Sequence, residues 1–139
     1  MAGAVFLADT SVYVLQARHP VVRKRFAELL TEGRIAACQM TALEYLNNAP
    51  DPADYETIWG ALTAQRWIDV TSAAMDRAME VHRELARSSQ HRHFRLPDLI
   101  IAATAEQAGA TVLHYDTDYD RIAAVTGQPT EWIAQRGSL

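Results

Sequence analysis

Residues 96–123, LPDLIIAATAEQAGATVLHYDTDYDRIA, contain the pattern that decides the fold. Pro97 is favoured in the first turn of a helix and Gly109 at its end, so the pattern predicts a helix over residues 97–109. Residues 111–115, which follow, are apolar toward both faces, as is typical of a strand covered by helices on both sides. This helix and strand predict one unit of an α/β domain.

The same alternation extends over the rest of the chain. Short apolar runs that predict strands occur at residues 4–8 and 35–38, with further candidates at residues 66–70 and 130–133. Helical patterns separate these runs, at residues 20–33, 40–49, 52–65, 72–89 and 117–127. Alternating strands and helices predict an α/β fold with a mostly parallel central sheet flanked by helices, in a single domain over residues 1–139.

Length and composition exclude several classes of protein. The chain has 139 residues, of which 49% are hydrophobic, which is enough for the core of one domain and too many for a disordered chain. Its one cysteine, Cys38, can form no intramolecular disulfide, which fits a reducing cytoplasm. The N-terminal sequence lacks the basic segment of a signal peptide, and no apolar run approaches the roughly 20 residues of a membrane helix. We therefore expect a cytoplasmic protein without a membrane segment.

Carboxylates lie directly after the predicted strands or early in the helices that follow them. In a parallel α/β sheet, the carboxyl ends of the strands and the first turns of the next helices share one edge, where ligands bind. The sequence therefore predicts that acids from four segments meet at this edge. These acids are Asp9, Glu44, Asp98, Asp116 and Asp118, with Asp120 close by.

Two interpretations of these acids remain open when each is taken singly. An aspartate at a helix start also caps free N–H groups and suits the helix dipole. Glu44 lies in an otherwise apolar turn, where it either faces solvent or requires a partner. Taken together, several carboxylates at one edge repel one another unless a cation lies among them. An all-oxygen set favours Mg²⁺ or Mn²⁺, and no Cys/His set has the spacing of a zinc site.

Three blocks, LADTSVYV, MTALEYL and the segment quoted at the start, resemble the PIN-domain nucleases in this order. The resemblance is specifically to the VapC-type toxins of bacterial toxin–antitoxin pairs, and it covers nearly the whole chain. It implies a single PIN-like domain and a ribonuclease that hydrolyses RNA with Mg²⁺ or Mn²⁺. One or two such ions can activate water, neutralise the phosphate oxygens and stabilise the leaving oxygen.

The resemblance also implies roles for individual residues. Asp9, Glu44, Asp98 and Asp116 match the family's catalytic, metal-binding acids, and Asp118 matches a further metal ligand. Ser11 matches a hydroxyl residue after the first aspartate. It could hydrogen-bond a ligand carboxylate or a metal-bound water, or cap the next helix. The sequence departs from the family where many relatives carry a glycine after the glutamate, because Asn47 and Asn48 stand there instead.

Partners follow from the resemblance and from the charge distribution. The resemblance implies an RNA substrate, a small VapB-type antitoxin and a homodimer. The net charge of −4 argues against nucleic-acid binding, but without the five proposed site acids 12 acids remain against 13 Lys and Arg. The segment HRELARSSQHRHFR contains Arg87, Arg92 and Arg95 and predicts contact with an RNA backbone. The alternative for this segment is an ordinary solvated helix end and loop.

Three other functions compete with the nuclease. A phosphatase of the haloacid dehalogenase type would use Asp9 as its nucleophile, but it requires a second aspartate where Ser11 stands. A receiver-like domain requires a lysine near its C-terminal end, and the chain's one lysine is Lys24. Neither has a use for Glu44, whereas a nuclease of this family needs it. A catalytically silent PIN domain that only binds RNA or protein remains the third alternative.

Overall fold

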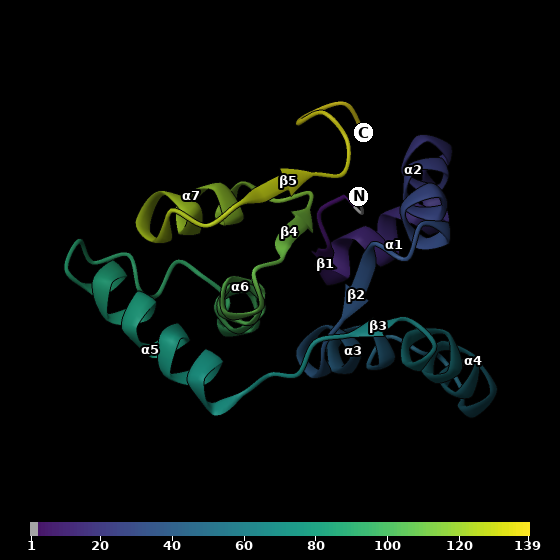
Figure 1. The fold of residues 1–139 in the computed structure, drawn as a ribbon, viewed down its shortest axis with the longest axis horizontal. Coiled ribbons are helices and arrows are strands. Elements are labelled where there is room, and N and C mark those ends of the chain that lie inside the picture. Colours follow the sequence, from purple (N-terminus) through teal and green to yellow (C-terminus); the bar gives the residue numbers. More distant parts are fainter. Residues whose placement is uncertain (1–2) are drawn as a thin grey trace.

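The computed structural model describes residues 3–139 and shows a five-stranded sheet between two layers of helices (Figure 1). The strands are β1 (Phe6–Ala8), β2 (Ile35–Ala37), β3 (Arg66–Trp67), β4 (Thr111–His114) and β5 (Thr130–Trp132). Their order across the sheet is β3-β2-β1-β4-β5, and all four neighbouring pairs are parallel. The predicted α/β fold with a parallel sheet is therefore confirmed.

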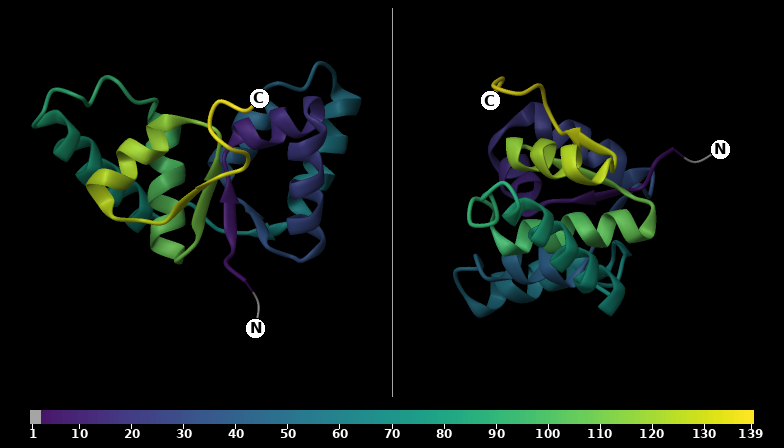
Figure 2. Two further views of the ribbon diagram at one scale, coloured as in Figure 1. Left: turned by 90° about the horizontal axis from the view of Figure 1, so that it is seen from above. Right: turned by 90° about the vertical axis from the view of Figure 1, so that its left-hand side faces the viewer.

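Seven helices connect the strands. They are α1 (Thr10–Arg18), α2 (Pro20–Thr31), α3 (Gln39–Leu46), α4 (Pro52–Thr63), α5 (Ser72–Ala86), α6 (Leu96–Ala108) and α7 (Thr117–Thr126). Helices α5, α6 and α7 cover one face of the sheet, while α1, α2 and α4 lie on the opposite side (Figures 1 and 2). Helix α3 contacts both α1 and α6, and thus joins the two layers beside the ends of the strands.

The core consists of two hydrophobic clusters, one on each face of the sheet. Leu7 and Val112 belong to the cluster that includes α5, α6 and α7, whereas Phe6 and Leu113 belong to the cluster under α1 and α2. Because successive side chains of a strand point to opposite faces, a strand covered on both sides must be apolar at every position. This explains the continuous apolar runs in the sequence.

Every predicted strand is present but shorter than predicted. The run at residues 4–8 forms a strand only from Phe6, and the run at residues 66–70 pairs over two residues only. Pairing stops where the chain turns into the next helix. At the end of β1, the Asp9 N–H donates to the carbonyl of Leu113 at 2.8 Å, so the last ladder bond holds Asp9 at the edge of the sheet.

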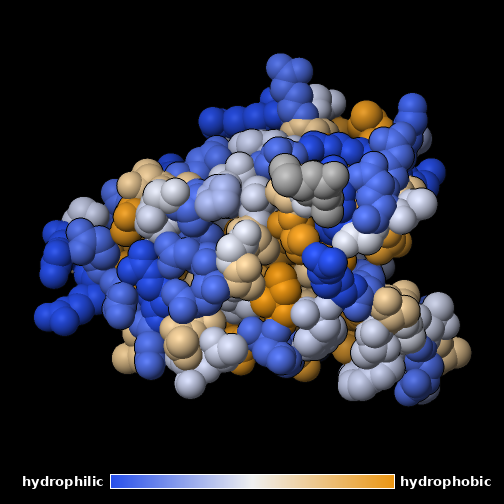
Figure 3. Space-filling model, in the orientation of Figure 1, coloured by the Kyte–Doolittle hydropathy of each residue, from blue (hydrophilic) through white to orange (hydrophobic). Residues whose placement is uncertain are grey.

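The surface is mostly hydrophilic on the face that Figure 1 presents, with hydrophobic residues gathered near the centre of that face (Figure 3). Within residues 3–139, no helix is both long and apolar enough to cross a membrane.

Candidate active site

Asp9 is held in one orientation by three hydrogen bonds. It caps α1, and its Oδ2 accepts from the Ser11 backbone N–H at 3.1 Å and from the Ser11 hydroxyl at 2.7 Å. Its Oδ1 accepts from the Tyr119 hydroxyl at 2.7 Å. Asp9 is only 6% exposed, so the surrounding residues leave its carboxylate little freedom to rotate.

Asp98 lies in the first turn of α6 and is 3% exposed. Burial raises the pKa of its carboxyl group to about 7, and the neighbouring carboxylate of Asp9 adds to this increase. The guanidinium of Arg95 acts in the opposite direction, while Glu44 and Asp116 raise the pKa further. Three carboxylates thus oppose the ionisation of Asp98, and one guanidinium favours it. The positive charge that the protein supplies here is too small to offset the negative charge.

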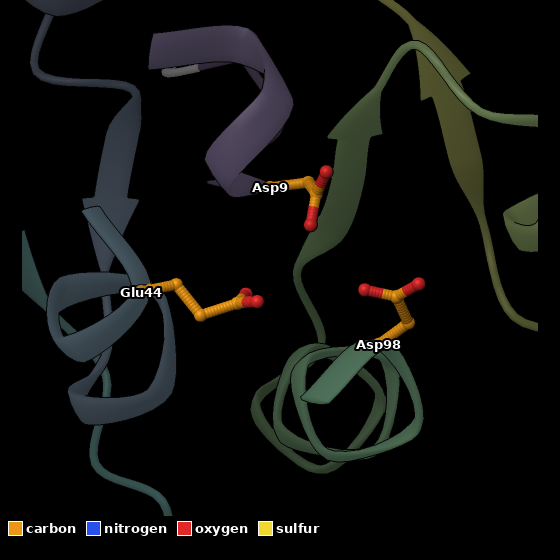
Figure 4. Close-up of side chains that lie close together, drawn as sticks. All are labelled: Asp9, Glu44 and Asp98. Carbon is orange, nitrogen blue, oxygen red and sulfur yellow. The ribbon is translucent and has the colours of Figure 1, made fainter. Parts of the chain in front are cut away.

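Glu44 reaches the same space from α3. Its Oε1 accepts from the Thr10 hydroxyl at 2.9 Å, and its Oε2 accepts from Arg95 Nη2 at 2.5 Å. Figure 4 shows Asp9, Glu44 and Asp98 pointing toward one another from three different elements. The position of α3 between α1 and α6 explains how a residue so distant in sequence joins the two aspartates.

Asp116 and Asp118 form a second group around Asp98. Asp116 follows β4 and caps α7, where its Oδ1 accepts from the Asp118 N–H at 2.9 Å. Oxygen atoms of Asp98, Asp116 and Asp118 lie within 4.8 Å of one another, as do those of Asp9, Glu44 and Asp98. Asp98 belongs to both groups and therefore joins them into one acidic cluster.

This cluster suits a divalent cation that prefers oxygen ligands. Both groups consist only of carboxylates, which are hard ligands of the kind that Mg²⁺ and Mn²⁺ prefer. Burial contributes most to the raised pKa of Asp98, and repulsion from the carboxylates of Asp9, Glu44 and Asp116 adds to it, so a cation among these groups would relieve both effects. Four of these acids, Asp9, Glu44, Asp98 and Asp116, also line an open cleft of about 520 Å³, through which an ion and a substrate can reach them.

The cleft brings together some of the other predicted residues and leaves others apart. Arg95 and Ser11 line it, although the Ser11 hydroxyl is engaged with Asp9. Asn47 and Asn48, which follow the glutamate of α3, also line it. Arg87 instead pairs with Glu84 at 2.7 Å on the surface of α5. Arg92 is exposed, and neither it nor Arg87 belongs to the described lining of the cleft.

Two residues outside the predicted set, Tyr119 and His93, also contact the acidic cluster. The Tyr119 hydroxyl lies 3.4 Å from Asp98 Oδ1 as well as 2.7 Å from Asp9, so it bridges both aspartates. Burial and the two carboxylates hold its pKa well above the usual range, so it remains a donor. His93 Nε2 lies 3.5 Å from Asp118 Oδ1 and accepts a hydrogen bond from Arg121 at 2.8 Å. The aromatic residue after Asp-x-Asp was a visible signal for Tyr119, whereas nothing in the sequence marked His93.

Residues 6–125 match the sequence model of the PIN domain. The chain belongs to the PIN-domain family. Ribonuclease VapC18 of Mycobacterium tuberculosis is 43% identical over 137 residues, which cover 97% of this chain and 99% of that protein. Ribonuclease VapC51 of the same organism is 41% identical over 134 residues, with 96% of each protein covered. The predicted resemblance to VapC-type PIN proteins is therefore confirmed.

Solved structures of toxin–antitoxin complexes share the PIN fold of this chain. The DNA-bound VapBC complex of Salmonella typhimurium contains a chain that matches with a TM-score of 0.76 at 20% identity, over 95% of this chain and all of that one. VapBC-5 of Mycobacterium tuberculosis contains a chain that matches with a TM-score of 0.63 at 25% identity, over 94% of this chain and 98% of that one. At these identities the matches support the PIN fold and its order of elements.

Proposed function

We propose that this chain is a metal-dependent endoribonuclease, the toxin of a toxin–antitoxin pair, that hydrolyses RNA phosphodiester bonds with Mg²⁺ or Mn²⁺. The observation that carries the proposal is the convergence of acids from three segments, at the start of α1, in α3 and at the start of α7, on Asp98 of α6, which belongs to both carboxylate groups. Relatives named as VapC ribonucleases match almost the full length of the chain. A silent binding module would have no need for two adjoining groups of potential ligands around one buried aspartate.

The proposed roles follow from the contacts of each side chain. Asp9, Asp98 and Asp116 hold the cation, which when bound activates water and neutralises the charge that develops on the phosphate. Ser11 and Tyr119 fix the Asp9 carboxylate, so no reorientation is required at that ligand. Glu44 and Asp118 either complete the ligand shell or orient the water. No covalent intermediate with the protein is required.

RNA would enter the cleft beside Arg95. Its side chain lines the cleft. A guanidinium can donate two parallel hydrogen bonds to two oxygen atoms of one phosphate group. Arg87 and Arg92 are proposed as outer contacts along the same loop, where exposed cations attract the backbone without reading its sequence. Binding through these residues should weaken with salt.

Partners are proposed from the relatives. The matching structures of Salmonella typhimurium and Mycobacterium tuberculosis are VapBC complexes, so we propose that a VapB-type antitoxin binds this chain and covers its cleft. We also propose that the chain forms a homodimer and works in the cytoplasm, where its RNA substrate is found.

The test is cleavage of a mixed pool of structured RNAs by purified protein with Mg²⁺, Mn²⁺ or EDTA. Cleavage should require the metal and should be abolished by Asp98→Asn, which removes the shared carboxylate. Asp76→Asn, at an exposed position of α5 outside the cleft, is the matched control and should cleave normally. Cleavage that persists in EDTA, or in Asp98→Asn, would contradict the proposed metal site. Metal binding without any cleavage would instead favour the silent module.

A further inference from the structure

Arg95 contacts the acidic cluster directly, and among residues 3–139 it is the one lysine or arginine that lines the cleft. It occupies the position directly before α6, and its own carbonyl accepts from the Asp98 N–H at 3.1 Å, so its backbone is fixed beside the shared aspartate. Its side chain is 66% exposed, yet Nη2 reaches Glu44 Oε2 at 2.5 Å. A long, exposed side chain is thus anchored at its backbone and held at its tip by a single ion pair.

With this ion pair, both carboxylate oxygens of Glu44 are engaged, so neither is free for a metal ion. Glu44 belongs to the carboxylate group with Asp9 and Asp98, and its other oxygen already accepts from the Thr10 hydroxyl. A guanidinium and a divalent cation at one carboxylate repel each other, because both are positively charged. Occupation of that group by a metal ion should therefore weaken the contact between Arg95 and Glu44.

We propose that Arg95 is a built-in counter-ion of Glu44 that a divalent cation displaces, and that the released guanidinium then binds a phosphate of the RNA. This inference rests on the proposed function, because it assumes the metal site and an RNA substrate. Arginine suits both positions, since it stays charged and its planar fork fits a carboxylate and a phosphate equally well. Its exposure leaves it free to move, while its anchored backbone keeps it within reach of the cleft.

One consequence is that Arg95 opposes metal binding in the absence of RNA. Isothermal titration with Mn²⁺ should show that Arg95→Gln binds the ion roughly 2- to 5-fold more tightly than wild type, as expected for the loss of one partly exposed ion pair. The gain should disappear when Arg95→Gln is combined with Glu44→Gln, because the contact no longer exists in that background. This double-mutant cycle separates the direct contact from the general effect of removing a positive charge.

The matched control is Arg92→Gln, which removes an exposed arginine of the same loop that does not line the cleft. It should leave the affinity for Mn²⁺ nearly unchanged. Thermal unfolding of each variant should show that the fold is retained, since Arg95 and Arg92 are both exposed.

A second consequence concerns the substrate. Fluorescence anisotropy with a labelled single-stranded RNA, in EDTA and in Ca²⁺, reports how much a cation strengthens RNA binding. Ca²⁺ carries the same charge and also prefers oxygen ligands. The affinity of wild type for the RNA should rise on addition of Ca²⁺, and the affinity of Arg95→Gln should rise by a smaller factor. An equal gain in both proteins would contradict the release of Arg95 toward RNA.

The outcomes distinguish this inference from the proposed function. If wild type binds no Mn²⁺, the metal-dependent nuclease itself is wrong. A second outcome is that wild type binds Mn²⁺ and Arg95→Gln changes the affinity for Mn²⁺ by the same factor in wild type and in Glu44→Gln. In that case only the displacement of Arg95 is wrong. If Arg95→Gln binds Mn²⁺ more weakly than wild type, the side chain supports the site and does not compete with the cation.

Discussion

The burial of Asp98 makes the stability of the cation-free protein depend on pH. Burial, Asp9 and Glu44 raise its pKa to about 7, whereas in the unfolded chain it stays near 4. Between about pH 4 and pH 7 the folded protein therefore keeps a proton that the unfolded chain has lost. The free energy of unfolding should fall as the pH rises through this window, by up to roughly 4 kcal/mol, and this contribution should then level off.

Urea unfolding of wild type and Asp98→Asn in EDTA, at several pH values from about 4.5 to 8.5, measures this dependence. The amide introduced by Asp98→Asn does not titrate, so this contribution to the pH dependence is absent from the variant. The unfolding free energy of wild type should therefore fall relative to that of Asp98→Asn as the pH rises. A difference that stays constant with pH would mean that Asp98 titrates in the same range in both states.

Tyr119 should act as a positioning residue for Asp9. Tyr119→Phe removes the donor to Asp9 Oδ1 and leaves a buried carboxylate oxygen without its partner, at a cost of about 1–3 kcal/mol in unfolding free energy. The affinity for Mn²⁺ should also fall by about 10-fold, because an outer hydrogen bond that orients a ligand is lost. Calorimetry with Mn²⁺ measures the second effect.

Tyr13→Phe is the matched control, since the buried Tyr13 hydroxyl donates to Gln65 at 2.8 Å, away from the cleft. It should lower stability without changing Mn²⁺ affinity. Equal losses of affinity in both variants would show that the effect at Tyr119 comes from general destabilisation.

The aspartates of the site could be predicted because each stands at the end of a strand or the start of a helix, and the fold fixes where those points lie. Asp9 and Asp116 directly follow buried strands, and Asp98 opens a helix, so a parallel sheet places all three at one edge. Tyr119 and Arg95 could be seen as an aromatic residue and a basic residue, but not as partners of Asp9 and Glu44. Those contacts join residues far apart in the chain and depend on how α3, α6 and α7 pack.

Among the helices, α1 is the one whose start and end could not be predicted from the sequence. Val12, Tyr13 and Val14 are β-branched or aromatic residues, which favour strands over helices. The Asp9 cap and the burial of Val12 and Tyr13 against the core outweigh this weak preference. The predicted strands were longer than the observed ones because apolar runs indicate burial, whereas strand pairing also requires a neighbouring strand of the same length.

The end of α6 matters because Asp98 stands at its start. Gly109 ends this helix with φ of 68°, a conformation that other residues adopt at a cost, so Gly109→Ala should lower the free energy of unfolding by about 1 kcal/mol. Gly60→Ala in the middle of α4 should do the opposite. A Cβ added there meets nothing within 4 Å, and alanine favours a helix interior by about 0.5–1 kcal/mol. Urea unfolding of both variants should give shifts of opposite sign.

For the whole molecule, the metal should stabilise the fold. A ligand that binds only the folded state adds about 2.7 kcal/mol at 100 times its dissociation constant. Thermal unfolding in Mn²⁺ should therefore occur at a higher temperature than in EDTA, and the increase should grow with the Mn²⁺ concentration. Asp98→Asn should lose most of this increase, because both carboxylate groups contain Asp98. The same increase in the variant would indicate that Mn²⁺ binds elsewhere.

The parallel pairing of β1 with β4 has a consequence for the cell that makes this protein. Strand β1 lies between β2, which follows early in the chain, and β4, which is synthesised about a hundred residues after β1. Asp98, Asp116 and Asp118 are likewise translated after most of the fold. A nascent chain that has not yet extended past α5 carries only Asp9 and Glu44 of the acidic cluster. The proposed catalytic centre is therefore incomplete until Asp98, Asp116 and Asp118 have been made, so the RNA of the translating ribosome does not meet it before then.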